Sequence, residues 1–111
     1  MANSRDSDTY YEDVTINTAP GVEGYWTNAV GNLRERDKIY MSLRETGDSS
    51  AFSATVTVQF KTPRDDDWQD YDTYTSTTRE IFEVNGPGVK WRVGVKNGDY
   101  TDGEVTVGFD W

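Results

Sequence analysis

The chain has 111 residues, of which 20 are acidic and 11 basic, so its formal net charge is -9, and it contains neither histidine nor cysteine. This length fits one domain. The composition excludes disulfides, thiolate nucleophiles, histidine-dependent catalytic triads and the ordinary zinc site, because each of these needs an imidazole or a thiol group.

The excess of acidic over basic residues also restricts the classes of partner that the protein is expected to bind. Nonspecific binding to nucleic acid depends on clustered Lys and Arg, which this sequence does not have. No apolar run approaches the roughly 20 residues that cross a bilayer. We therefore expect neither nucleic acid nor a membrane as a partner.

The first half of the chain contains three predicted strands and one segment without a clear pattern. Residues 1–9 (MANSRDSDT) are polar and are predicted to form a flexible N-terminal arm, followed by one domain over residues 10–111. A strand is predicted over 10–16 (YYEDVTI), with a turn at Pro20 and Gly21. Segment 22–37 has no clean period, although NLRERDK (32–38) suits a helical turn.

Strict alternation then marks two strands, over 38–44 and 52–60. The first places Ile39, Met41 and Leu43 on one face. The second places the following apolar residues on one face: Phe52, Ala54, Val56, Val58 and Phe60. Pro63 and three consecutive aspartates end the second strand, since proline cannot donate a ladder hydrogen bond and like charges repel.

The second half contains four further predicted strands. WQDYDTY (68–74) is typical of an edge strand with one solvated face, and REIFEV (79–84) is a short strand before an NGPG turn. Two closing runs alternate in the same way, one with Val89, Trp91, Val93 and Val95 on a face, the other with Val105, Val107, Phe109 and Trp111. KNGDYTDG (96–103) is predicted to be the loop that joins them as a terminal hairpin.

Seven or eight short strands separated by turn signals, without a long helix, predict an all-β fold. The expected architecture is an antiparallel β-sandwich or jelly roll in which each sheet has one solvated face. The two tryptophans in register with valines, Trp91 and Trp111, are predicted to belong to the core.

The acidic clusters offer hard oxygen ligands of the kind that calcium prefers, over 65–72 (DDDWQDYD) and 97–104 (NGDYTDGE). Neither has EF-hand spacing, so we interpret both as solvated turns and expect no metal, with calcium left open. Pairs of carboxylates also raise glycoside hydrolysis, but twenty acids in a small chain form pairs by chance. We expect no cofactor and no enzymatic activity.

Aromatic residues outside the predicted core suggest a binding surface. They are Tyr25, Trp26, Trp68, Tyr71 and Tyr74. Such rings can stack on sugars or bury area at a protein interface at low entropic cost. A carbohydrate-binding β-sandwich module is therefore one alternative function.

The end of the chain, GPGVKWRVGVKNGDYTDGEVTVGFDW, resembles the last strands of small virion proteins of tailed phages. There, a W-R-V-x-V strand, a polar loop with glycine and a T-V-x-F-x-W-like strand close a β-sandwich. With its acidity, length and aromatic-rich strands, the chain resembles the capsid decoration or staple proteins of short-tailed bacteriophages of the epsilon type. The resemblance leaves a tail or head-fibre subunit as a further alternative.

The resemblance implies a structural protein on the capsid exterior of the virion, which binds the major capsid protein and bridges neighbouring capsomers. It also implies a small symmetric homo-oligomer, with a dimer favoured, and it supplies no catalytic residues. We expect the contacts in residues 1–13 and 22–37. The segment NLRERDK can meet acidic groups through Arg34, Arg36 and Lys38. The candidate residues for the capsid contact or the self-interface are Tyr10, Tyr11, Tyr25, Trp26, Arg34, Arg36, Trp68 and Tyr71.

Overall fold

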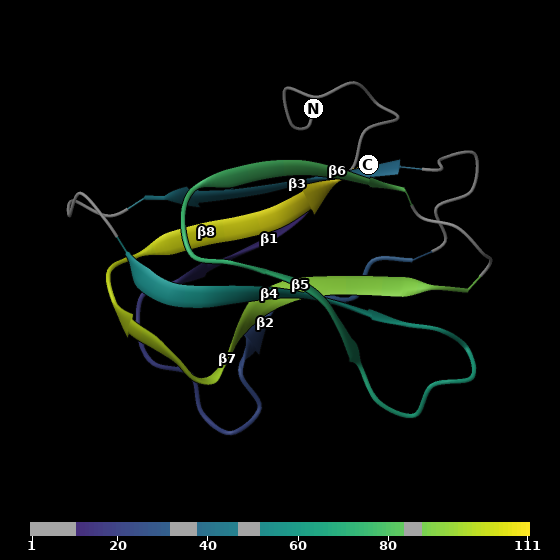
Figure 1. The fold of residues 1–111 in the computed structure, drawn as a ribbon, viewed down its shortest axis with the longest axis horizontal. Helices are drawn as coiled ribbons and strands as arrows, with labels where there is room; N and C mark the ends of the chain where they lie inside the picture. The colour runs from purple at the N-terminus through teal and green to yellow at the C-terminus, as the bar shows by residue number, and fades with distance from the viewer. Residues whose placement is uncertain (1–10, 32–37, 47–51, 84–87) are drawn as a thin grey trace.

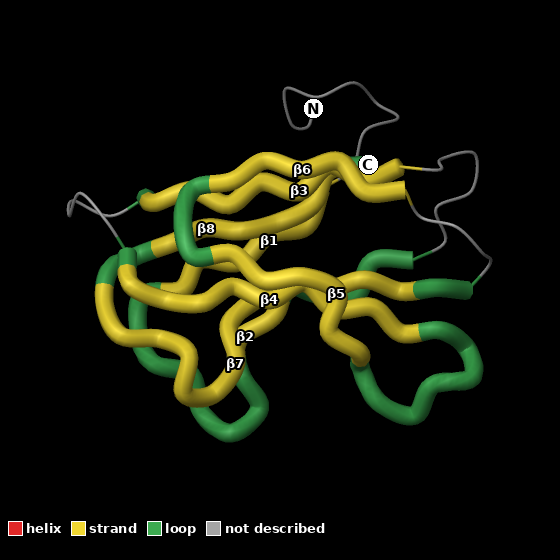
Figure 2. Tube along the Cα trace, viewed as in Figure 1, coloured by secondary structure: helices red, strands yellow, loops and turns green. Residues whose placement is uncertain are grey.

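Every segment that alternates strictly in sequence forms a strand in the computed structural model, which describes residues 11–31, 38–46, 52–83 and 88–111. The described residues contain no helix (Figure 2). The strands are β1 (Tyr11–Ile16), β2 (Tyr25–Trp26), β3 (Lys38–Glu45), β4 (Ser53–Lys61), β5 (Gln69–Tyr74), β6 (Thr78–Glu83), β7 (Lys90–Asp102) and β8 (Val105–Asp110). The predicted all-β fold is confirmed.

Two four-stranded sheets stack face to face, with the strand orders β1-β8-β3-β6 and β2-β7-β4-β5 (Figure 1). All pairs are antiparallel. The chain behaves like one long hairpin folded over itself, because β1 pairs with β8, β2 with β7, β3 with β6 and β4 with β5. This pairing is the jelly roll, an arrangement with two Greek keys.

The core lies between the two sheets and consists of the predicted inward faces. Ile39, Met41 and Leu43 of β3 are buried against the valines of β4, β7 and β8. Trp91 is buried as predicted, and Trp111 is half-buried against the core. Removing these apolar side chains from water supplies about 25 cal/mol per Å² of apolar surface.

The predicted terminal hairpin is wrong, because β7 and β8 lie in different sheets. Strand β7 also continues to Asp102, through most of the segment 96–103 that the sequence analysis assigned to a loop. Its register with β4 shifts around Ala54, which lets the strand bend from one sheet toward the other. The connection is therefore a crossing between layers, near Gly103.

Segment 22–31 contains a strand that the sequence analysis did not predict. Tyr25 and Trp26 form β2 beside β7, and Val30 forms an isolated bridge with Trp91. Tyr10, the predicted arm 1–9 and most of the predicted helical turn 32–38 lie outside the described residues. No helix in the described part of the chain has the length and apolar composition needed to span a membrane.

Candidate functional site

The free edges of β5 and β6 lie on the same side of the sandwich. β6 ends one sheet and β5 ends the other, and residues 75–77 connect the two strands directly. Figure 1 shows this connection crossing from the upper to the lower sheet. Unpaired strand edges in a sheet protein are sites where further strands can add.

An apolar cleft opens beside these two edges, and we call it the edge cleft. It has a volume of about 610 Å³. Its lining residues are Phe60, Thr62, Tyr71, Ile81, Phe82, Glu83, Val89 and Trp91. Three of them are consecutive residues of β6, so the cleft runs along the free edge of that strand.

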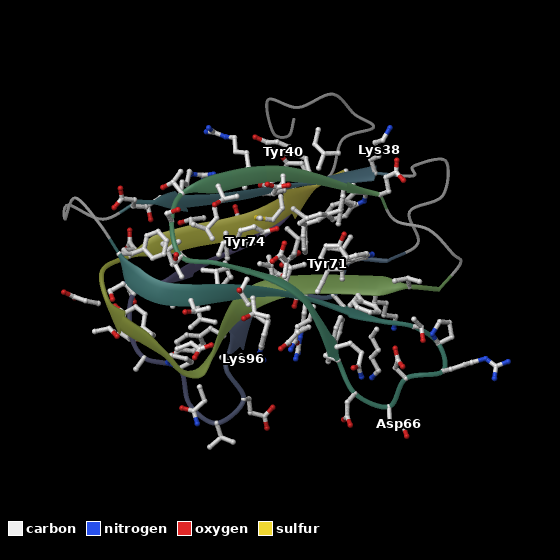
Figure 3. The ribbon with its side chains drawn as sticks, in the orientation of Figure 1. Lys38, Tyr40, Asp66, Tyr71, Tyr74 and Lys96 are labelled. Carbon is white, nitrogen blue, oxygen red and sulfur yellow. The ribbon has the colours of Figure 1, made fainter. Side chains whose placement is uncertain are left out.

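Four aromatic rings pack together at this cleft. Phe82 stacks on Trp91 with ring centroids 5.9 Å apart, and Tyr71 meets both rings edge-to-face at 5.2 and 5.1 Å. Phe60 lies 5.8 Å from Trp91. Figure 3 shows Tyr71 between the two sheets. These contacts join strands of both sheets, so they hold the open side of the sandwich together.

The edge cleft also exposes large apolar side chains to solvent. Ile81 is 63% exposed and Tyr71 is 49% exposed, which is high for large apolar side chains. The indole Nε1 of Trp91 is buried and donates to no acceptor in the described part of the chain. An exposed apolar patch at an open sheet edge is typical of a surface that binds another protein.

Near Tyr74, the edge strands β5 and β6 bring two carboxylates, Asp72 and Glu80, close to the tyrosine hydroxyl. The Tyr74 hydroxyl donates a hydrogen bond of 3.2 Å to Asp72 Oδ2. Burial and then the charge of Asp72 raise the pKa of Tyr74 above its ordinary value, and Glu80 of β6 adds to this effect. The tyrosine therefore stays neutral and donates to the carboxylate.

A second surface lies on the outer face of the β2-β7-β4-β5 sheet, and we call it the cation–π stack. The Arg92 guanidinium lies 4.1 Å from the ring centroid of Trp26 and 4.5 Å from that of Trp68. Lys61 lies 6.0 Å from the Trp68 ring. Side chains at alternate positions of β4 and β7 point outward on this face. Here Trp26 of β2, Trp68 from the turn before β5, and Arg92 of β7 come together.

A chain of polar contacts extends from the cation–π stack toward β5. Arg92 Nε donates to Gln59 Oε1 at 2.9 Å, and Gln59 Nε2 donates to Asp70 Oδ1 at 2.8 Å. Lys96 Nζ lies 2.6 Å from Asp70 Oδ2. Hydrogen bonds from Lys96 and then Gln59 lower the pKa of Asp70, whereas burial lowers the pKa of Arg92. Asp70 is therefore held in its ionised form, and Arg92 keeps its charge because arginine is not deprotonated in proteins, so both partners of Gln59 are charged.

Arg92 already covers one face of each indole ring in the cation–π stack. Trp26 and Trp68 share Arg92, and the Trp26 indole N–H donates to the Glu23 carbonyl at 2.8 Å. A Cβ on Gly24 would meet Trp26 Nε1 at 2.7 Å, so the turn 21–24 packs against this indole. The stack therefore holds the outer face of the sheet together.

The structure divides the predicted contact residues among separate places. Trp26 and Trp68 meet around Arg92, whereas Tyr71 lies in the edge cleft. Tyr25 is opposite the buried Val95 and therefore projects from the other face of β2, where its hydroxyl is 3.4 Å from Thr18 Oγ1.

Tyr11 lies on β1, at the far edge of the other sheet, and is exposed. Tyr10, Arg34 and Arg36 fall outside the described residues. Within the described residues, no single surface gathers the whole predicted set.

Sequence reasoning missed three residues of these surfaces. The strand that contains Arg92 is predicted from its valines, so Arg92 does not stand out in the sequence. The signal that could identify it is its outward position between the inward-facing Trp91 and Val93. For Phe82, the sequence predicts only a place in a short strand. Ile81 breaks the expected alternation by exposing a large apolar side chain beside Phe82, which is the signal for a contact surface.

The acidic clusters form no group of three or more potential metal ligands among the residues that the structure describes. Asp65 instead caps its turn, accepting hydrogen bonds from the Thr62 backbone N–H at 2.9 Å and its hydroxyl at 3.0 Å. Asp102 accepts one from the Gly103 N–H at 2.8 Å. These two side chains perform the turn chemistry that aspartate commonly provides.

Comparison with known proteins gives no assignment. No family model and no curated protein sequence matches this chain.

Proposed function

We propose that the protein is a virion structural protein that binds the outside of an assembled phage capsid and bridges neighbouring capsomers. Its partner in this proposal is the major capsid protein, and it acts as a small homo-oligomer, with a dimer favoured. This function is adhesion to other proteins, which requires a rigid scaffold and exposed contact surfaces.

The observation that carries this proposal is the jelly roll with an apolar cleft at its open edge. Ile81 and Tyr71 expose large side chains beside the unpaired edge of β6, where a neighbouring protein can bury them. The likeness of the closing strands to small phage virion proteins supports the same function. Many copies on one lattice gain avidity, so each contact with the shell can be weak.

The experiment mixes purified protein with capsid shells that lack it and follows co-sedimentation. We expect saturable binding with a fixed number of copies per capsomer, and an image of the decorated shell should place the added density on its outer surface. A folded protein that stays in the supernatant would remove the proposal. A stable trimer located away from the shell facets would replace it with a tail or head-fibre subunit.

One arrangement favours a second candidate, a carbohydrate-binding module. Trp26 and Trp68 share one outer face with Gln59, Asp70 and Arg92, and indole rings beside planar polar groups are suited to sugar rings. On this function, a glycan array would detect saturable binding that Trp68→Ala abolishes. Because Arg92 already occupies one face of each ring, a sugar would need the opposite face of Trp68 or displacement of the arginine.

A further inference from the structure

The strand β6 is the outermost strand of its sheet and pairs only with β3. One side of its backbone therefore has no strand partner among the described residues. Edge strands of this kind are usually blunted by prolines, bulges or inward charges. The sequence of β6, TREIFE, has no proline, and its register with β3 is regular over all six residues. Glu80, opposite the buried Met41, is the one charged residue on the inner-face side of β6, and it is exposed.

We propose that β6 pairs antiparallel with β6 of a second copy of this chain, about a two-fold axis that lies between the two copies of Ile81. The two four-stranded sheets β1-β8-β3-β6 then join edge to edge into one continuous sheet. The inference rests on the dimer named in the proposed function and identifies its interface. It requires nothing from the capsid and can be tested in free solution.

Side-chain direction restricts the register of this pairing. Residues opposite each other in a sheet point to the same face, so one residue of β6 must lie opposite its own copy, with the two-fold axis between them. Phe82 faces the core, opposite Ile39 of β3, while Ile81 faces outward, opposite Tyr40. Figure 3 shows Tyr40 on the outer side of this sheet. A slip of one residue between the two copies would place inward-facing residues of one β6 opposite outward-facing residues of the other, which the geometry of a sheet does not allow.

Charge then favours one register among those that remain, since an axis at Phe82 would place Ile81 opposite Glu83 and gain no pair of opposite charges within β6. An axis at Ile81 places Arg79 of each copy opposite Glu83 of the other, which gives two pairs of opposite charge. An axis at Arg79 or Glu80 would instead place two like charges opposite each other. Like charges directly across a sheet are destabilising, whereas opposite charges stabilise. The sequence of β6 is therefore self-complementary about Ile81.

Exposed apolar surface supports the same axis. Ile81 would meet Ile81 of the second copy, so its 63% exposed side chain becomes covered. The edge cleft opens along Ile81, Phe82 and Glu83, so the second copy also covers part of this cleft. Pairing of short strands buries little area alone, and stable interfaces bury about 1,200–2,000 Å² in total. The exposed Tyr71 and Ile81 supply the additional apolar area.

The register is tested by cross-linking, because the native chain contains no cysteine. In Ile81→Cys, the two thiols lie directly across the axis and should form an intermolecular disulfide rapidly under mild oxidation. Glu80→Cys should cross-link much more slowly, since its neighbour across the interface is Phe82. The matched control is Val22→Cys, which is 88% exposed in a turn remote from β6. Equal rates for the three variants would overturn the register.

The interface is tested by charge reversal, with sedimentation equilibrium as the measurement. Arg79→Glu and Glu83→Arg should each weaken the dimer on the order of ten-fold, because two attractive pairs become repulsive. The double variant should restore it. Arg64→Glu, in the exposed turn before β5, changes the net charge as Arg79→Glu does and should leave the dimer intact. Circular dichroism confirms that each variant is folded.

A wild-type protein that stays monomeric at its highest soluble concentration would overturn the inference, as would a double variant that stays monomeric. The shell experiment gives a separate result. A dimer with this register that fails to bind shells would remove the capsid proposal alone, whereas a protein that binds shells as a monomer would remove the interface alone.

Discussion

Arg92 is the residue on which the outer face of the β2-β7-β4-β5 sheet depends. Its guanidinium lies between two indole rings and donates to the buried Gln59. We expect Arg92→Ala to lower the free energy of unfolding by about 1–3 kcal/mol, through the lost cation–π contacts and the unpaired amide oxygen. Urea denaturation measures this. The control Arg44→Ala, at an exposed position of β3, should have little effect.

Asp70 makes the stability of the folded protein depend on pH in the acid range. Hydrogen bonds from Lys96 and Gln59 hold the pKa of Asp70 below its ordinary value of 3.8. The stability from its ionised form is therefore fully present above pH 3.8 and is lost as the pH falls through the lower folded pKa.

The substitution Asp70→Asn removes the ionisable group from this network. We expect the urea midpoint of the variant to fall less steeply with acid below pH 3.8 than that of the wild type. Asp66→Asn, in the exposed turn labelled in Figure 3, is the matched control. An equal acid dependence in Asp70→Asn and wild type would contradict this role of Asp70.

At the scale of elements, the last strand is central. β8 lies between β1 and β3 and pairs with both. Deleting residues 105–111 would leave β1 without a pairing partner in its sheet and remove Val105, Val107 and Phe109 from the core. We expect an unfolded chain by far-ultraviolet circular dichroism. Removal of Trp111 alone, which follows β8 and is half-buried, should lower stability but retain the β-sheet spectrum.

The short strand β2 depends on a glycine in its partner. A Cβ on Gly94 would overlap the Tyr25 carbonyl oxygen and lie 2.8 Å from Trp26 Cα, so β2 would have to move. We expect Gly94→Ala to cost about 1–3 kcal/mol in urea denaturation, the usual range for overpacking. A Cβ on Gly21 meets nothing within 4 Å, so Gly21→Ala should be close to neutral. Equal stability of both variants would mean that β2 is not held by this close approach.

At the scale of the whole molecule, the topology controls folding kinetics. β1 pairs with β8, so strands from the two ends of the described chain must meet before that sheet is complete. Such distant pairing makes all-β sandwiches fold in milliseconds to seconds. We expect refolding on this timescale by stopped-flow tryptophan fluorescence. Folding in microseconds would contradict a transition state that requires the jelly-roll pairing.

Alternation in the sequence is enough to locate most strands and to identify most residues of the core. Alternation is a local property of the backbone, so Met41, Val58 and Val107 could be assigned to buried faces without knowledge of their neighbours. The same alternation predicted the edge strand β5. It could not detect β2, because two residues are too few to show a period.

Which strands are neighbours follows from packing between distant parts of the chain, and the sequence does not predict it. The turn-rich segment between two strongly alternating strands predicts a hairpin. In the structure, β7 and β8 belong to different sheets, because they bury their apolar faces in the common core from opposite sides. The same non-local packing brought Trp26 and Trp68 together around Arg92 and placed Tyr71 with Ile81 beside a free edge. Strand pairing depends on distant parts of the chain, and a period of two residues carries no information about them.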